Sequence, residues 1–387
     1  MGWTARNLTD TFHLPPGIFA PSAYDFPDDR TRHVIYLGGT GGSDSTGALH
    51  ELYCGTDDVW HEKDLMAESG GPHASSAPRA YLFVLEGTQH VLYLGTAGDG
   101  RLRELYQDDG WHANDLTADS GSQPARKVAQ GFEYASGRAQ VVVFQGIDRH
   151  VHVLTRKSRD DGDPSWVHKD LTSDHGGPVC ARAPGGYSFS PGGTMHVDYL
   201  GDDGRLYEYT GTANLTWGEP VDIGAGLDGP GGFADDAYRG YGFAADGTRH
   251  VDVVDTAGDV WEYRYDGTWS VENLTGPLGA GPVLAGTSVS AYAFEATDAV
   301  PVPTQHVVYA GADHLIHELW RDPTGWHENP LTGAGQPPAA STPSAFVDHA
   351  SSTQHMFYTS QANEVVELRW TDRPTLSETA RPRHRLD

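Results

Sequence analysis

Histidine and glutamate recur along this chain at matched intervals, and they are the residues best suited to do chemistry. A histidine stands at six equivalent places, and a glutamate follows it after 18, 14, 12, 12, 12 or 12 residues. A hairpin of that length places the start of one strand near the end of its neighbour, so we expect each pair to be cross-strand neighbours. The pairs are His33 with Glu51, His90 with Glu104, His196 with Glu208, His250 with Glu262, His306 with Glu318, and His355 with Glu367.

The repeated pairs have two interpretations. In the structural one, each histidine hydrogen-bonds a turn or the facing carboxylate and fixes the register of its hairpin, because buried polar groups need partners. In the binding one, each pair faces a crevice between neighbouring units, where a tryptophan adds an aromatic wall. Sugars need hydrogen bonds for their hydroxyls and an apolar face for their C–H groups. We expect up to six weak sites for glycans or other small polar ligands, with Trp3, Trp60, Trp111, Trp217, Trp269 and Trp326 as walls.

A repeat carries these residues. Seven tryptophans, the six above and Trp166, follow one another at steps of 57, 51, 55, 51, 52 and 57 residues. A period of roughly 50 residues with several short strands per unit is typical of a β-propeller. In the second unit we expect strands around 80–83, 87–95, 102–106 and 111–117, joined by Gly/Asp turns. The sequence predicts an all-β, seven-bladed β-propeller of four-stranded antiparallel blades, and no run is long or periodic enough to predict a helix.

The two ends of the chain complete one unit between them. The last unit has predicted strands around 345–347, 355–358 and 365–370, but no tryptophan strand follows them. The N-terminus has such a strand at 2–9, so we expect it to complete the last blade and close the ring, which removes a free sheet edge. Residues 1–371 then form a single domain, and 372–387 are predicted to be a flexible tail.

The charge of the chain limits its partners. With 53 acidic and 26 basic residues, its formal net charge is −27, which argues against nucleic acid or an anionic membrane, since both demand a basic footprint. The sequence contains neither an apolar N-terminal region nor an apolar run of about 18 residues, so neither a signal peptide nor a membrane span is predicted. We expect a soluble protein, cytoplasmic or secreted, with no cofactor. Cys54 and Cys180 fall in different units and are not expected to form a disulfide.

The repeat His-Val-x-Tyr-x-Gly, Gly-x-Leu-x-Glu-Leu-Tyr, Gly-Trp resembles the blade of the fucose-binding-lectin type of β-propeller, and the similarity runs through all seven units. In that family an arginine on the second strand and a glutamate on the third bind the sugar, with aromatic residues from the blade interface. The resemblance assigns the glutamate role to the six repeated glutamates. Histidine stands where the family has arginine, and it lacks the planar five-donor fork of that residue. The third unit has Gln140 and Val153 in place of the pair, and it is expected to bind nothing.

Two other functions stay open. Seven-bladed propellers also host lyases and hydrolases, with one site at the central channel built from residues that break the repeat. The third unit contains a His/Asp group of the kind that binds a divalent metal, but its spacing matches no known ligand pattern and no metal site is predicted. The other alternative is an interaction scaffold with an exposed apolar patch and no small ligand. The His/Asp group comprises His150, His152, His168, His175, Asp160 and Asp161.

Overall fold

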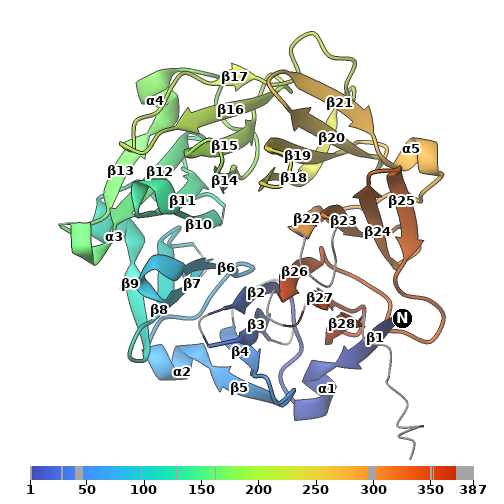
Figure 1. Ribbon diagram of the computed structural model, residues 1–387. Coiled ribbons are helices and arrows are strands. Elements are labelled where there is room, and N and C mark those ends of the chain that lie inside the picture. The colour runs from blue at the N-terminus through green and yellow to red at the C-terminus, as the bar shows by residue number, and fades with distance from the viewer. Residues whose placement is uncertain are drawn as a thin grey trace, which may run out of the picture.

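A computed structural model describes residues 2–27, 29–39, 47–96, 98–127, 130–161, 163–294, 302–348, 351 and 353–371. Within these residues the chain forms seven four-stranded antiparallel sheets, which are arranged as blades around a central axis (Figure 1). The seven-bladed propeller predicted from the tryptophan repeat is therefore confirmed.

Within each blade the strands follow one another outward in chain order, and the first strands contact one another around the axis. The blades comprise β2 (Ser22–Phe26), β3 (Thr31–Gly38), β4 (Ala48–Cys54) and β5 (Trp60–Asp64); β6 (Arg79–Phe83), β7 (Thr88–Leu94), β8 (Leu102–Gln107) and β9 (Trp111–Asp115); β10 (Gln130–Tyr134), β11 (Ala139–Gln145), β12 (Val151–Lys157) and β13 (Val167–Asp170); β14 (Gly185–Phe189), β15 (Thr194–Leu200), β16 (Leu206–Gly211) and β17 (Val221–Asp222); β18 (Phe233–Phe243), β19 (Thr248–Asp255), β20 (Val260–Tyr265) and β21 (Trp269–Asn273); β22 (Val289–Phe294), β23 (Thr304–Ala310), β24 (Ile316–Asp322) and β25 (Gly325–Pro330); and β26 (Ser344–Asp348), β27 (Thr353–Thr359), β28 (Val365–Thr371) and β1 (Gly2–Asn7).

The N-terminal strand closes the ring, as predicted. Strand β1 lies antiparallel against β28, with Trp3 opposite Trp370 and Arg6 opposite Glu367, and Figure 1 shows the N-terminus beside the last blade. The strand ends at Asn7 and not at residue 9, because Leu8 begins a helix. Residues 372–387 lie outside the described residues, so the flexible tail stays a prediction.

Short helices follow the fourth strand in five blades of the described chain, and the sequence did not predict them. The cause is a capping residue at the end of the strand: the side chains of Asn7, Asp64, Asp115 and Asp170 accept hydrogen bonds from backbone N–H groups two or three residues later. Helices of four or five residues are too short to show a helical period. They are α1 (Leu8–Phe12), α2 (Leu65–Ser69), α3 (Leu116–Ser120), α4 (Leu171–His175) and α5 (Thr275–Leu278), and single 3₁₀ turns occur at Val84–Glu86, Ala135–Gly137 and Arg159–Asp161.

The third blade differs from the expected alignment by one residue. Val141 lies opposite Phe132, as His90 lies opposite Tyr81 in the second blade. Val141 therefore occupies the histidine position, and Gln140 lies one residue before it. Without a histidine, the sequence of this blade gives no marker for the register of the hairpin. Val153 does occupy the glutamate position, so the third blade lacks the pair, as expected.

The core consists of separate apolar clusters, most of which bridge neighbouring blades. The second strands are buried on both faces, and every residue of β11 is buried. Cys54 and Cys180 are both buried, and they lie in different blades. In the described residues, no helix is both long and apolar enough to cross a membrane.

Candidate functional site

The six predicted His/Glu pairs all form, at equivalent places in six blades. In each pair the imidazole Nδ1 lies between 2.7 and 3.2 Å from the carboxylate Oε1. None of these twelve residues is more than 5% exposed. Each pair is therefore an internal contact between the second and third strands of its blade.

The second blade shows how these side chains are held. The His90 Nε2 lies 2.8 Å from the hydroxyl of Thr88, and the His90 ring stacks on Tyr81 with centroids 4.9 Å apart. The Glu104 Oε1 also accepts a hydrogen bond from the Tyr81 hydroxyl at 3.0 Å, and Oε2 accepts one from Asn114 at 3.2 Å. Both carboxylate oxygens and both imidazole nitrogens thus have partners, which is the arrangement expected for register fixing.

The surroundings of Glu104 and Tyr81 shift the pKa values of both side chains. Burial acts to raise the pKa of Glu104, but the facing His90 and hydrogen bonds from Asn114 and Tyr81 outweigh it and hold the pKa below its usual value. Burial beside Glu104 raises the pKa of Tyr81 well above its ordinary value, so Tyr81 stays a hydrogen-bond donor.

In most blades a polar residue stands one place before the histidine position, and it extends the network across the crevice to the preceding blade. Gln89 lies 2.7 Å from the Tyr24 hydroxyl of the first blade. Gln140 lies 3.2 Å from the Nε2 of His90, and Gln305 lies 2.9 Å from the Nε2 of His250. These contacts therefore join the buried second strand of one blade to the first or second strand of the preceding blade.

The crevice between the first and second blades contains a cavity of about 110 Å³. The first blade contributes the pair itself and Lys63, whose Nζ lies 3.9 Å from the Glu51 Oε2 and 4.9 Å from the centroid of the Tyr53 ring. The cavity brings together a carboxylate, an imidazole and a tryptophan, which is the combination that the sequence predicted. Its lining comprises Asp29, Thr31, His33, Glu51, Tyr53, Lys63, Gln89, Gln107 and Trp111.

The crevice between the fourth and fifth blades is filled differently. The Arg249 guanidinium lies 2.5 Å from the Oε1 of Glu208 and 2.7 Å from the Nδ1 of His196. The same guanidinium lies 4.2 Å from the ring centroid of Tyr265 and 5.3 Å from that of Trp269. Burial is the main effect that lowers the pKa of His196 below its ordinary value, and Arg249 adds to it. An arginine–glutamate pair is present here, but the arginine comes from the neighbouring blade.

The tryptophans face the blade that precedes their own. Trp217 packs in a cluster with Val141 and Val153, so it lies in the crevice that has no His/Glu pair. Trp166, which was left out of the predicted site, packs in a cluster with Tyr81 of the second blade. Among the described residues, the buried indole N–H groups of Trp60, Trp111 and Trp217 have no hydrogen-bond acceptor.

Six residues of the cavity lining were missed in the sequence: Asp29, Thr31, Tyr53, Lys63, Gln89 and Gln107. For Gln89 a signal exists, because glutamine also precedes the histidine at Gln305 and Gln354. Lys63 has a lysine counterpart only at Lys169 of the third blade, and Gln107 has no glutamine counterpart, so the repeat could not mark them.

The central channel contains a polar cavity of about 200 Å³. Arg79 and Arg239, from the second and fifth blades, line it with Gln130, whose Oε1 accepts a hydrogen bond from Arg239 at 3.3 Å. Removal from water, together with the neighbouring Arg79, lowers the pKa of Arg239 to about 9, so Arg239 is still a cation at neutral pH. These residues break the sevenfold repeat, which is what a single central site needs.

Two further carboxyl groups lie beside the pairs of the fourth and fifth blades. Asp198 is opposite Glu208 and Asp252 is opposite Glu262, and both aspartates are fully buried. Burial, with the neighbouring glutamate, raises the pKa of each aspartate well above its ordinary value. Folding therefore favours the neutral acid form of each aspartate over its carboxylate.

We expect Asp198→Asn to stabilise the protein at pH 8 by about 1–2 kcal/mol and to have little effect at pH 4. A carboxyl group whose pKa is raised on folding contributes stability below its unfolded pKa of about 3.9, and this contribution is lost as the pH rises toward the folded pKa. The amide replaces the neutral acid without that loss. Urea unfolding at both pH values checks this, with the exposed Asp228→Asn as control. Equal stabilities of the variant and the wild type at pH 8 would contradict it.

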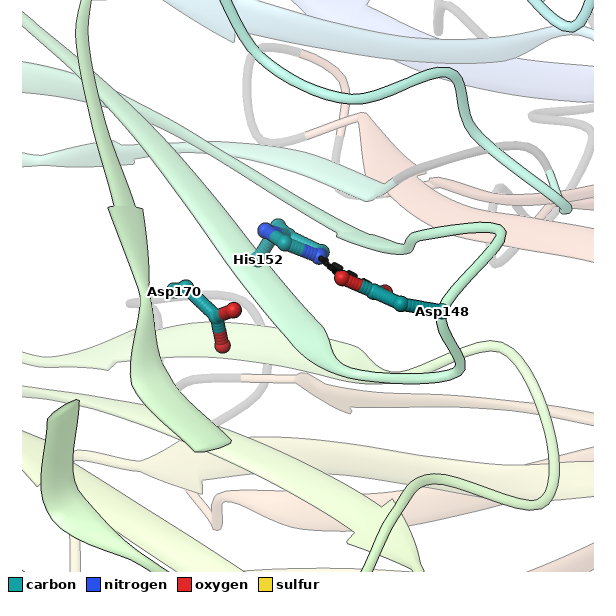
Figure 2. Close-up of side chains that lie close together, drawn as sticks. All are labelled: Asp148, His152 and Asp170. Carbon is teal, nitrogen blue, oxygen red and sulfur yellow. Dashed lines mark hydrogen bonds and ion pairs between the residues drawn. The ribbon is translucent and has the colours of Figure 1, made fainter. Parts of the chain in front are cut away.

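The His/Asp group of the third blade is partly assembled. His150, His152 and His168 come together beside Asp148 and Asp170, which the sequence did not single out. Asp161 instead accepts a hydrogen bond from Arg138, and among the described residues no hydrogen bond or ion pair places Asp160 or His175 in the group. Figure 2 shows His152 pointing at Asp148, with Asp170 on the adjacent strand.

Comparison with known proteins agrees with the fold. No protein-family model and no curated protein matches the sequence. The BP39L lectin from Burkholderia pseudomallei has a similar structure, with a TM-score of 0.65 and 16% identity over 91% of this chain and 96% of that chain. AofleA from Arthrobotrys oligospora gives a TM-score of 0.51 and 14% identity over 96% of this chain and 87% of that chain. At these identities the likeness shows the fold, and it confirms the resemblance to propellers of this lectin type.

Proposed function

We propose that this protein is a carbohydrate-binding, lectin-like propeller and that the crevice between its first and second blades is the principal sugar site. The observation that carries the proposal is the cavity in which Glu51, His33 and Trp111 meet. BP39L, a propeller of similar fold, is described as a lectin, and this supports carbohydrates as the ligand class.

In this proposal, different lining residues contact the hydroxyls and the C–H groups of the sugar. The Oε2 of Glu51 accepts a hydrogen bond from a sugar hydroxyl, and Lys63 and Gln107 donate to others. The rings of Trp111 and Tyr53 pack against C–H groups. The volume of about 110 Å³ is below the roughly 300 Å³ at which ordinary ligand pockets begin. Only one edge of a monosaccharide enters this cavity, so binding at a single site is weak. Several such sites on one rigid ring raise the avidity for a multivalent glycan.

In this proposal the other five His/Glu pairs mark weaker sites. The tryptophans Trp60, Trp269, Trp326 and Trp3 face such pairs, and the Nε1 of Trp326 donates to Glu272 of the preceding blade at 3.0 Å. The crevice of Trp217 lacks a pair and contributes no site. Arg249 takes part of the space beside Glu208, so this crevice is the one in which we expect the weakest binding.

We expect Lys63→Ala to weaken binding of the best-recognised monosaccharide about 10-fold at one site, because Lys63 is partly exposed and lies beside the Glu51 oxygen. The sugar is first chosen on a glycan array and then titrated calorimetrically. The matched control is Lys169→Ala, which removes the lysine at the equivalent position opposite Val153.

Glu51→Gln gives a second test, because it keeps the shape of the side chain and removes the charge. It should weaken the same site, Glu104→Gln should weaken another, and Val153→Ala should leave sugar binding unchanged. Failure of every glycan to bind, or equal effects of the Lys63 and Lys169 variants, would refute the proposed site.

A second candidate is a single site in the central channel, and the two arginines of its cavity favour an anionic ligand there. It would be supported if Arg239→Gln abolished binding of a carboxylate or phosphate ligand while glycan binding was absent. Glycan binding that survives Arg239→Gln would favour the crevices.

A further inference from the structure

We propose that the third blade holds a Zn²⁺ ion between Asp148, His150, His152 and Asp170. This is the blade that has lost the His/Glu pair, so the site is independent of the proposed sugar sites. His152 lies in β12 and His150 directly precedes that strand, Asp148 lies in the hairpin before them, and Asp170 ends β13 opposite His152.

The ligand atoms of Asp148, His152 and Asp170 form one close group, and the His150 imidazole lies beside its two aspartates. Bonds of about 2.0–2.2 Å place neighbouring ligand atoms about 3.3–3.6 Å apart. The His152 Nε2 lies 3.2 Å from the Oδ2 of Asp148, and the His150 Nδ1 lies 3.8 Å from that oxygen and 2.8 Å from the Oδ2 of Asp170. The three ligand atoms of Asp148, His152 and Asp170 all lie within 4.8 Å of one another. Small side-chain shifts are enough to seat the ion.

Other blades show how the same two carboxylates are normally neutralised. In the second blade, Arg101 lies 2.6 Å from the Oδ2 of Asp115, and Arg103 lies 3.4 Å from Asp99 and 3.3 Å from Asp115. These four residues occupy the positions of His150, Asp170, His152 and Asp148.

In the fourth blade the two equivalent aspartates have one arginine and one tyrosine hydroxyl as partners. Arg205 lies 3.2 Å from Asp222, and the Tyr207 hydroxyl donates to Asp203 at 2.8 Å. Among the described residues, the ion pairs of Asp148 and Asp170 are with histidines alone, and in the sixth blade Asp313 likewise pairs with His317, but no second histidine joins it there. Two histidines therefore stand where the second blade has two arginines, and a divalent ion held by both histidines and both aspartates would balance the two carboxylates.

The surroundings of these residues fit a metal centre. The His152 Nδ1 lies 2.9 Å from the Nε2 of His168, which orients the ring and leaves the His152 Nε2 toward Asp148. The Oδ1 of Asp170 accepts from the Ser173 amide at 2.9 Å and caps α4, which leaves Oδ2 for the ion. The side chains of Asp148, His150 and Asp170 are 21–29% exposed, so an ion can enter from solvent.

The test is a calorimetric Zn²⁺ titration of chelator-treated protein, with metal content measured after dialysis. We expect one Zn²⁺ per chain in the wild type, and at least a 10-fold loss of affinity in His150→Gln, whose side chain is partly exposed. The double variant His150→Arg/His152→Arg installs the arginines of the second blade, and it should retain no Zn²⁺ while unfolding at a temperature near that of the wild type without metal.

Controls separate this site from the general acidity of the protein. His317→Arg adds a cation at the equivalent position of the sixth blade, beside Asp313 and Glu328, and it should leave Zn²⁺ binding unchanged. Ca²⁺, which prefers oxygen ligands, should bind at least 10-fold more weakly than Zn²⁺. Equal binding of Zn²⁺ by His150→Gln and the wild type, or equal binding of Ca²⁺ and Zn²⁺, would overturn the proposal.

Discussion

Deletion of residues 1–12 is expected to lower the unfolding temperature by more than about 10 °C or to leave the protein insoluble. The deletion removes β1 from the edge of β28 and the buried Leu8 from the last blade. Loss of one buried leucine alone costs about 2–5 kcal/mol, against a total stability of roughly 5–15 kcal/mol for an ordinary domain. It also exposes a long strand edge, which invites aggregation. Thermal unfolding and size-exclusion chromatography measure both effects.

The control for this deletion is Ala5→Ser, at an exposed position of the same strand, which should change the unfolding temperature by no more than a degree or so. A synthetic peptide of residues 1–12 should restore part of the lost stability to the shortened chain. A shortened chain that unfolds at the wild-type temperature would show that β1 does not hold the ring closed.

Replacement of Glu104 by alanine is expected to destabilise the protein by about 3–5 kcal/mol. The carboxylate is fully buried and accepts hydrogen bonds from His90, Tyr81 and Asn114. Its removal leaves these groups buried without an acceptor and creates a cavity. Glu104→Gln keeps the shape and one acceptor, so its cost should be smaller. Urea unfolding gives both values, and the exposed Glu219→Ala is the control.

The stability difference between the wild type and Glu104→Gln should depend on pH in a defined direction. Because the pKa of Glu104 is lowered in the folded protein, the carboxylate contributes stability above its unfolded pKa of about 4.3. That contribution is lost as the pH falls through the folded pKa. The difference should therefore be full at pH 7 and shrink below about pH 4. A difference that stays constant down to acidic unfolding would mean that the pair is not ionised.

The observed His/Glu pairs are compatible with both interpretations made from the sequence, register fixing and sugar binding. Their burial and complete hydrogen bonding in the second blade fit the register role, while the cavity beside Glu51 leaves room for a ligand. A large stability cost for Glu104→Ala with unchanged sugar binding would favour the structural role in that blade. Loss of sugar binding at unchanged stability in Lys63→Ala would favour the binding role in the first crevice.

The sequence did not predict the short helices, the register of the third blade or the blade that each tryptophan faces, and each miss has a physical reason. The short helices depend on single capping residues such as Asp64 and Asp170, and not on periodicity. The register of the third blade had no histidine to mark it, so Gln140 was placed one residue away from its true position. The pairing of Trp217 with the third blade, and of Trp166 with the second, depends on which face of each blade its tryptophan covers.

The sequence by itself determined the number of blades, the strand order within each blade, the closure by the N-terminal strand and the six His/Glu contacts. Each of these follows from local patterns that repeat at a constant period, and a pattern of cross-strand neighbours is set by hairpin length. Only the tertiary structure decided which crevice has an open cavity, which groups Arg249 and Arg239 contact, and which aspartates approach His152. Those contacts join blades or loops whose residues occur once, so they depend on how side chains pack between sheets and not on the repeat.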